Sequence, residues 1–235
     1  MKILVVGGMH GNEPLGIELV KALRNKPINN VDAVFANERA IQQNVRFVDQ
    51  DLNRTFPGSV NGKTYEQRRA AWLIEKAKHY DIVLDFHNTY CSGNDCCFIG
   101  EQAKPILTQT AGFLDLRRVI VANYDCLNKY AKNCISIEIS LDSPINSTEL
   151  WYDRVRLLAQ LQQFTTEGVI EKYLFTYRMS LQDRDTYKLK KANLKAFQAI
   201  DPALANKLGV RSPAYPIFIG DRFTPYNYGG ILEKI

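Results

Sequence analysis

The sequence predicts an α/β fold with a mixed, mostly parallel sheet that carries helices on both faces. Short apolar runs typical of buried strands alternate with longer segments in which apolar residues recur at helical spacing. After Gly168 the pattern changes to short tyrosine-rich segments with several prolines. For a chain of 235 residues, we therefore predict a main domain over residues 1–167 and a small β-rich domain over residues 168–235.

The individual elements follow from periodicity and from capping residues. Strands are predicted over residues 2–7, 33–36, 81–87, 97–99, 118–122 and 134–139. Helices are predicted after a cap at Asn12, from a Thr64–Gln67 capping box to about His79, and from an Asn146–Glu149 cap to about Gly168. The polar segment 44–62 is predicted to be a long ordered loop.

Composition argues against two classes of partner. The net charge of +5 is mild, and its one dense patch, at Lys188, Lys190, Lys191 and Lys195, is typical of a solvated face. No run reaches the roughly 18 apolar residues of a membrane span, and the apolar run that opens the chain is too short for a secretion signal. Five cysteines without a CxxC pair favour free thiols. We expect a cytoplasmic protein with no nucleic-acid or membrane partner.

Polar clusters lie at the ends of three predicted strands. His10, Asn12 and Glu13 follow the first strand, His87 ends another, and Glu138 lies on a third. Ligands of open α/β sheets bind beyond the carboxyl ends of the strands. We therefore expect these three distant segments to converge on one rim of the sheet.

His10 and Glu13 stand three residues apart where strand gives way to helix, so both side chains can face one ion. Together with His87 they form the His₂Glu set of catalytic zinc sites, which leave a fourth position open for water. A lone HxxE pair is a weak signal, because such pairs also cap helices or occupy surfaces. The glycine-rich segment before it lacks the spacing of a phosphate loop.

Two further features point to chemistry at this rim. In the strand 134–139 the isoleucines share one face and Glu138 shares the other with serines, and a buried acid there is costly unless it is paired or functional. A half-exposed edge position is the alternative. The loop that holds Arg46 and Arg54 could clamp a carboxylate, since arginine donates two parallel hydrogen bonds, or it could form local Asp–Arg pairs at the surface.

Taken together, these segments resemble the aspartoacylase and succinylglutamate desuccinylase family, which is related to zinc carboxypeptidases, and they are most similar to aspartoacylase. The resemblance covers roughly residues 1–140 and is thinner in the tail. The matching segments, in the order of the family, are Gly8–Glu13, Asn37–Ala40, Arg46–Phe56, Asp85–Thr89 and Ile137–Glu138. Five ordered matches are far more specific than any one of them.

The resemblance implies a zinc-dependent amidohydrolase that deacylates a small anionic N-acyl amino acid, similar to N-acetylaspartate, through attack of zinc-bound water. One zinc ion per chain would be bound by His10, Glu13 and His87. Glu138 would act as general base and then as general acid, and Arg46 would polarise the acyl carbonyl. The implied substrate-binding residues are Asn53, Arg54, Asn88, Tyr124, Lys129 and Tyr226, with Tyr228 as the alternative to Tyr226.

The sequence departs from the family at the position that reads the side-chain carboxylate. Aspartoacylases place an arginine about ten residues before the catalytic glutamate, where this chain has Asn128 followed by Lys129. Lysine supplies a point charge but no planar fork. Two other functions stay open: cleavage of short peptides by a carboxypeptidase-like enzyme, and a catalytically silent binding protein that kept the fold. A homo-oligomer is also left open.

Overall fold

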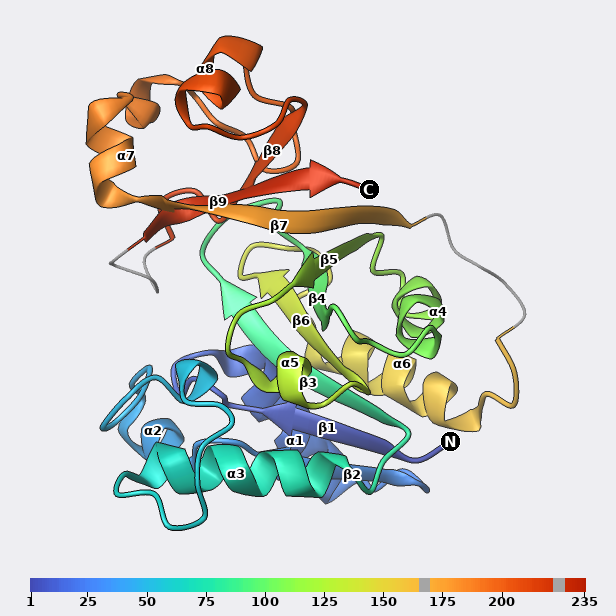
Figure 1. Cartoon of the computed structure of the whole chain (residues 1–235). Helices are drawn as coiled ribbons and strands as arrows, with labels where there is room; N and C mark the ends of the chain where they lie inside the picture. Colours follow the sequence, from blue (N-terminus) through green and yellow to red (C-terminus); the bar gives the residue numbers. More distant parts are fainter. Residues whose placement is uncertain (165–169, 222–226) are drawn as a thin grey trace.

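The structure is a computed structural model that describes residues 1–164, 170–221 and 227–235, and one nine-stranded sheet runs through this part of the chain (Figure 1). The strands are β1 (Ile3–Gly7), β2 (Val31–Phe35), β3 (Ile82–Thr89), β4 (Cys96–Gly100), β5 (Arg118–Ala122), β6 (Cys134–Ser140), β7 (Glu171–Ser180), β8 (Ala214–Ile217) and β9 (Asn227–Lys234). The α-helices are α1 (Pro14–Asn25), α2 (Glu38–Gln43), α3 (Tyr65–Ala77), α4 (Ile106–Phe113), α5 (Leu127–Tyr130), α6 (Thr148–Gln160), α7 (Leu181–Thr186) and α8 (Pro202–Lys207). Two 3₁₀ turns are η1 (Leu52–Arg54) and η2 (Leu189–Lys191).

The sheet is mixed and mostly parallel, as predicted. Its strand order is β2-β1-β3-β6-β4-β5-β7-β9-β8. The first four strands in this order are parallel to one another, and β5 is parallel to both β4 and β7. Antiparallel pairing occurs between β4 and β6 and among β7, β9 and β8. The carboxyl ends of β1, β3 and β6 therefore meet at one edge.

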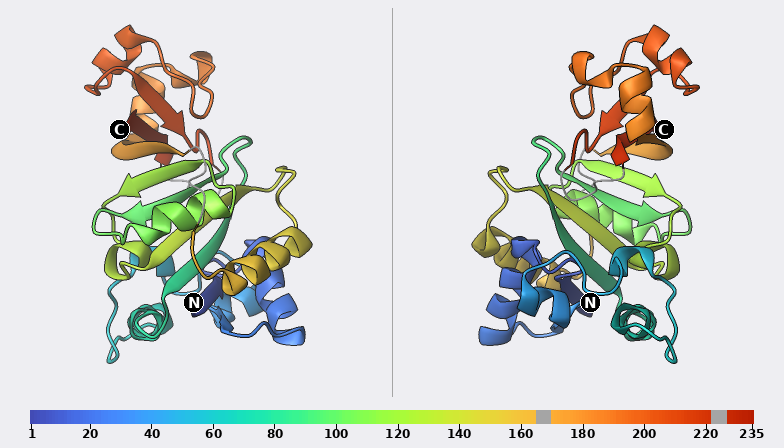
Figure 2. Two further views of the ribbon diagram at one scale, coloured as in Figure 1. Left: turned by 90° about the vertical axis from the view of Figure 1, so that its right-hand side faces the viewer. Right: turned by 90° about the vertical axis from the view of Figure 1, so that its left-hand side faces the viewer.

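Helices cover both faces of this sheet, which confirms the prediction (Figure 2). On one face α1, α4 and α6 pack against alternate residues of the central strands, and Phe86 and Trp151 meet edge to face at 5.1 Å. On the other face α3 and α5 pack against the intervening residues, such as Val6 and Val83. No helix of the described residues is long and apolar enough to cross a membrane.

The C-terminal strands extend this same sheet, because β7 pairs with β5 (Figure 1). Around them a separate buried cluster includes Met179 of β7, Ala205 of α8 and Ile231 of β9. Helices as well as strands form this region. The division at residue 167 stays a prediction, since residues 165–169 lie outside the described part of the chain.

Helix ends show which capping predictions were right. The Thr64–Gln67 capping box opens α3 as predicted. The predicted cap at Asn12 is wrong: α1 begins one residue later, with Glu13 as N-cap and Pro14, whose φ is fixed near the helical value, in the first turn. For α6 the N-cap is Ser147, whose hydroxyl accepts from the Leu150 N–H, and the helix ends at Gln160 rather than near residue 168 because the next residue is extended.

The end of β1 packs directly against α1, and two glycines make this contact close. A Cβ at Gly7 would lie 2.0 Å from the carbonyl oxygen of Gly16, and a Cβ at Gly16 would lie 2.9 Å from the Cβ of Phe86. Backbone is thus in contact with backbone. This contact sets the position of the segment that leaves β1.

Gly7→Ala should therefore destabilise the protein. The added methyl group would push α1 away from β1, and overpacking of this kind costs about 1–3 kcal/mol in the free energy of unfolding. Denaturant unfolding followed by circular dichroism measures the change. Lys21→Ala, at an exposed position of α1, is the control and should change stability by less than about 0.5 kcal/mol. Equal stability of the Gly7→Ala variant and the parent would contradict the close contact.

Candidate metal centre and active site

The central strands β3 and β6 carry the site on one face. Along β6 the isoleucines point into the core beneath α1 and α6, and Ser136 and Glu138 point to the opposite face, as predicted. In the parallel register His87 lies directly beside Glu138, and Asp85 lies beside Ser136. One strand pair thus places an imidazole next to a carboxyl group.

The segment between β1 and α1 brings two more side chains to the same place. Gly8 has a φ of +70°, a left-handed conformation that favours glycine, and it turns the chain after β1. Gly11 packs so closely on the backbone of α2 that a Cβ would lie 2.1 Å from the Ala40 carbonyl carbon. The chain then enters α1 at Pro14. His10 and Glu13 are therefore held by a tightly packed turn.

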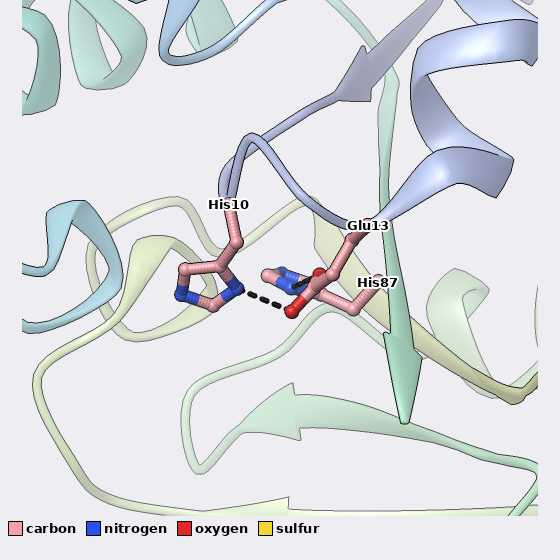
Figure 3. A group of neighbouring side chains, drawn as sticks. All are labelled: His10, Glu13 and His87. Carbon is pink, nitrogen blue, oxygen red and sulfur yellow. Dashed lines mark hydrogen bonds and ion pairs between the residues drawn. The ribbon is translucent and has the colours of Figure 1, made fainter. Parts of the chain in front are cut away.

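His10, Glu13 and His87 meet at one point (Figure 3). Their ligand atoms all lie within 4.8 Å of one another. Glu13 joins the two rings, with Oε1 2.6 Å from His10 Nδ1 and Oε2 3.0 Å from His87 Nδ1. The three residues are 2%, 3% and 1% exposed, respectively. Two imidazole nitrogens and a carboxylate in this arrangement are a donor set that suits a divalent metal ion.

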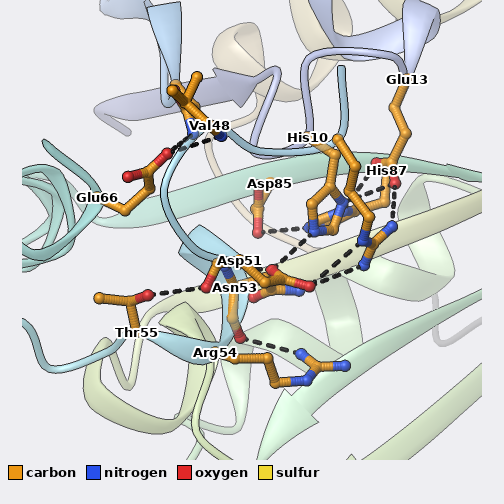
Figure 4. Close-up of polar contacts among 12 residues, drawn as sticks. His10, Glu13, Val48, Asp51, Asn53, Arg54, Thr55, Glu66, Asp85 and His87 are labelled. Atoms are coloured by element: carbon orange, nitrogen blue, oxygen red, sulfur yellow. Dashed lines mark hydrogen bonds and ion pairs between the residues drawn. The ribbon is translucent and has the colours of Figure 1, made fainter. Parts of the chain in front are cut away.

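The other nitrogen of each ring is held by a carboxylate that the sequence analysis did not assign (Figure 4). His10 Nε2 lies 3.1 Å from Asp51 Oδ1, and His87 Nε2 lies 3.0 Å from Asp85 Oδ2. Metal-binding histidines usually donate their second N–H to such a group, which fixes the tautomer and leaves the first nitrogen free as a ligand. Both rings thus have the support expected of metal ligands. Asp85 had a signal, since it precedes His87 by two residues on the same strand face.

The charges of this cluster reinforce one another. Burial alone lowers the pKa of His10, but the charge of Glu13 and the hydrogen bonds to Asp51 and Glu13 outweigh it, so the pKa is raised. Burial likewise opposes ionisation of Glu13, yet the two histidines hold the pKa of its carboxyl group well below the usual range. Glu13 is therefore ionised at neutral pH, as a metal ligand must be.

Glu138 is a different kind of carboxyl group. Burial raises its pKa to about 7, and the charge of His87 opposes this rise without cancelling it. Its side chain lines the cleft beside His10 and Glu13. A carboxyl group with a pKa near neutrality can both accept and return a proton.

The loop 44–62 is ordered through a buried glutamate that the sequence analysis missed (Figure 4). Glu66, at the start of α3, is fully buried, and its Oε1 accepts from Asn37 Nδ2 and from the Val48 N–H, each at 3.1 Å. Two residues before Val48, Arg46 donates to Asp51 Oδ2 through Nε and Nη2, and its Nη1 lies 3.4 Å from Glu13 Oε1. The loop therefore adds an arginine directly beside the three donors.

These groups line a cleft that is open to solvent. Among the residues assigned from sequence, those lining it are His10, Glu13, Arg46, Asn53, Arg54, Asn88, Tyr124 and Glu138. Further lining residues are Phe98, Phe175, Arg178, Phe218, Asp221, Asn227, Gly229 and Gly230. His87 lies buried beneath this surface.

Two of the assigned substrate residues, Lys129 and Asn88, are engaged in other contacts. Lys129 does not line the cleft, and its Nζ pairs with Asp125 Oδ1 at 2.9 Å. Asn88 does line the cleft, but its Oδ1 accepts from the Leu15 N–H and its Nδ2 donates to the Ile139 carbonyl, so its amide supports the fold. Tyr226 lies outside the described residues; Tyr228, the alternative to it, is buried in the C-terminal cluster.

Asp51→Asn should weaken binding of a divalent ion. An amide at this position would no longer hold His10 and Arg46 with a full charge, and changes of this kind cost about 10-fold to 100-fold in metal affinity. Zn²⁺ competition against a chelating dye measures the affinity. Asp49→Asn removes an exposed carboxylate from the same loop and should leave the affinity unchanged. Equal effects of the two substitutions would contradict the role of Asp51.

Comparisons with known proteins show to which family this chain belongs. A family model described as the succinylglutamate desuccinylase/aspartoacylase catalytic domain matches residues 1–150. A probable aspartoacylase of Prochlorococcus marinus subsp. pastoris is 31% identical in an alignment of 115 residues, and the match covers 44% of this chain and 39% of that protein. An N-acyl-aromatic-L-amino acid amidohydrolase (carboxylate-forming) of Rattus norvegicus is 30% identical in an alignment of 135 residues, and the match covers 50% of this chain and 42% of that protein. The matches thus span about two fifths of these relatives.

Solved structures share the fold across the whole chain. The succinylglutamate desuccinylase of Chromobacterium violaceum has a TM-score of 0.75 at 17% identity and covers all of this chain and 84% of its own. Murine aminoacylase 3 has a TM-score of 0.71 at 19% identity and covers all of this chain and 95% of its own. Since the family model spans well over half of its residues, the chain belongs to the succinylglutamate desuccinylase/aspartoacylase family.

Proposed function

We propose that this protein is a zinc-dependent hydrolase that cleaves the amide bond of a small acidic N-acyl amino acid, releasing a carboxylate and a free amino acid. One observation carries the proposal. Two of the three metal donors, a carboxyl group with a pKa near 7 and three arginines line a single cleft, and the third donor, His87, lies buried beneath it. Each part of an amide hydrolysis thus has a candidate group within the same space.

The zinc ion would be held by His10, Glu13 and His87, because their nitrogen and oxygen donors converge. The second ring nitrogen of each histidine is within hydrogen-bond distance of a carboxylate, which fixes the orientation of the ring. When bound there, zinc would supply Lewis acidity toward a carbonyl oxygen and lower the pKa of water at the site. The nitrogen and oxygen donors with an open side toward the cleft fit this ion.

The remaining residues divide the reaction between them. Glu138 would take a proton from the attacking water and later deliver it to the leaving nitrogen, for which its raised pKa suits it. Arg46, held by Asp51, would donate to the developing oxyanion. Asn53 and Arg54 line the cleft and would bind the α-carboxylate through the N–H groups of their side chains.

The names of the relatives support an N-acyl amino acid as the substrate, but they do not agree on the side chain of that amino acid. Some are probable aspartoacylases, and others are N-acyl-aromatic-L-amino acid amidohydrolases. Three arginines line the cleft of this chain, and arginine binds carboxylates through two parallel hydrogen bonds. This feature favours an acidic substrate.

Zinc binding should depend on His87 and not on His79. The chain has three histidines, and His79 is exposed at the end of α3, away from the donor set. His87→Ala should abolish binding of the expected single zinc ion per chain, because it removes one of three donors. His79→Ala should still bind it. Metal analysis after dialysis gives the stoichiometry, and an unchanged zinc content in the His87→Ala variant would contradict the assignment.

Glu138→Gln should retain zinc yet lower kcat about 10²-fold to 10⁴-fold, since the amide cannot carry the proton. The zinc-loaded protein is assayed for release of free amino acid from acetyl, formyl and succinyl derivatives of aspartate and glutamate. Near-normal turnover by the variant would show that Glu138 is not the base. Cleavage of short peptides without any deacylation would favour the carboxypeptidase-like function instead.

A further inference from the structure

Arg178 is a cation in the cleft to which no role has been assigned. It lies on β7, in the C-terminal part of the chain, and lines the cleft with His10, Glu13 and Glu138. Among the described residues it forms no ion pair, whereas Arg46 is paired with Asp51. A charged group at a cleft without a counter-ion is available for an anionic ligand.

Arg178 and Arg54 both lie close to the ring of Tyr124. The guanidinium carbon of Arg54 is 5.2 Å from the centroid of the Tyr124 ring, and that of Arg178 is 5.5 Å from the same centroid. Desolvation and the nearby charge of Arg54 both lower the pKa of Arg178. Two like charges held around one ring repel each other, and an anion between or beside them relieves that repulsion.

Aromatic side chains form the wall behind these arginines. Phe98 packs on Phe218 at 5.9 Å and on Tyr124 at 6.2 Å, and Tyr124 packs on Phe175 at 5.9 Å. Gly230 of β9 leaves the room for this wall, since a Cβ there would lie 2.4 Å from the Phe175 ring. An apolar wall reduces the competition from water, so it strengthens a charge-assisted hydrogen bond formed in front of it.

The residues at the position where aspartoacylases carry an arginine cannot supply this charge. Asn128 is buried, and its Oδ1 accepts from the Cys126 thiol at 2.7 Å. Lys129 pairs with Asp125 and does not line the cleft. Arg178 of β7 lines the cleft, whereas Asn128 and Lys129 do not.

We propose that Arg178 binds a second carboxylate of the substrate while Arg54 and Asn53 hold the α-carboxylate. This inference rests on the proposed deacylation and narrows its substrates to dicarboxylic N-acyl amino acids. The second carboxylate lies either on the amino acid side chain or on the acyl group. Arg178 is thus a residue that determines specificity, and its planar fork suits bidentate contact with a carboxylate.

The test compares N-acetylaspartate with N-acetylasparagine, which has nearly the same shape but lacks the second charge. In the zinc-loaded protein Arg178→Met should lower kcat/KM for N-acetylaspartate about 10-fold to 100-fold, as expected for a lost charged hydrogen bond, and should change that for N-acetylasparagine less than about 3-fold. Arg178→Lys should restore part of the loss. N-succinylalanine shows whether the acyl carboxylate is read in the same way.

Two further variants serve as controls for this test. Arg211→Met removes an arginine whose side chain is 82% exposed and does not line the cleft. This variant should have an unchanged kcat/KM for both substrates. Lys129→Met tests Lys129, the other candidate cation. The inference would be overturned if Lys129→Met lost the preference for N-acetylaspartate over N-acetylasparagine while Arg178→Met kept it. Equal losses on both substrates in Arg178→Met, or none, would overturn it as well.

Failure of the proposed function can be distinguished from failure of this inference. Titration calorimetry measures binding of N-acetylaspartate to Glu138→Gln and to the double variant with Arg178→Met, independently of turnover. A protein that binds N-acetylaspartate through Arg178 but hydrolyses none of these compounds would refute the deacylase proposal alone. If the protein hydrolyses N-acetylaspartate but Arg178→Met does not change the affinity for it, this inference alone is refuted.

Discussion

The carboxylate of Glu13 is the contact on which the site depends. It lies within hydrogen-bond distance of both His10 and His87, which come from segments far apart in the chain. Burial of such a cluster is costly unless every polar group has a partner. Here the Nε2 atoms of His10 and His87 lie within hydrogen-bond distance of Asp51 and Asp85, so three carboxylates stabilise the two rings.

The fold supplies these partners through ordinary rules of α/β structure. Parallel pairing brings the ends of β1, β3 and β6 to one edge, and the alternation of strand residues places His87 and Glu138 side by side on one face. Close packing at Gly7 and Gly11 positions the turn that carries His10. Glu66 fixes the loop that brings Asp51 and Arg46, and the C-terminal strands add Arg178 on the aromatic side.

Much of this arrangement could be predicted from the sequence because periodicity reports it directly. The alternation of residues around Glu138 correctly predicted that its side chain lies on the face opposite the isoleucines. The carboxyl ends of the parallel strands predicted where His10 and His87 converge. The role of Asp85 could also have been read from its strand position. The cap of α1 was predicted one residue early, since Asn12 suits a cap but Pro14 fixes the first helical position at the next residue.

Other features had no local signal in the sequence. Asp51 contacts His10 across a loop whose path depends on the buried Glu66, so only tertiary structure reveals the contact. Arg178 reaches the cleft because β7 pairs with β5, a long-range pairing that no local pattern encodes. The Lys129 side chain, chosen for its closeness in sequence to the expected position, pairs with its neighbour Asp125 instead.

X-ray absorption at the zinc edge of the zinc-loaded protein tests the central claim most directly, because it identifies the atoms around the ion. Ligation by His10, Glu13 and His87 predicts a first shell of nitrogen and oxygen at about 2.0–2.1 Å, with scattering from two imidazole rings and no sulfur. A shell with sulfur at about 2.3 Å, supplied by any of the five free cysteines, would contradict the account.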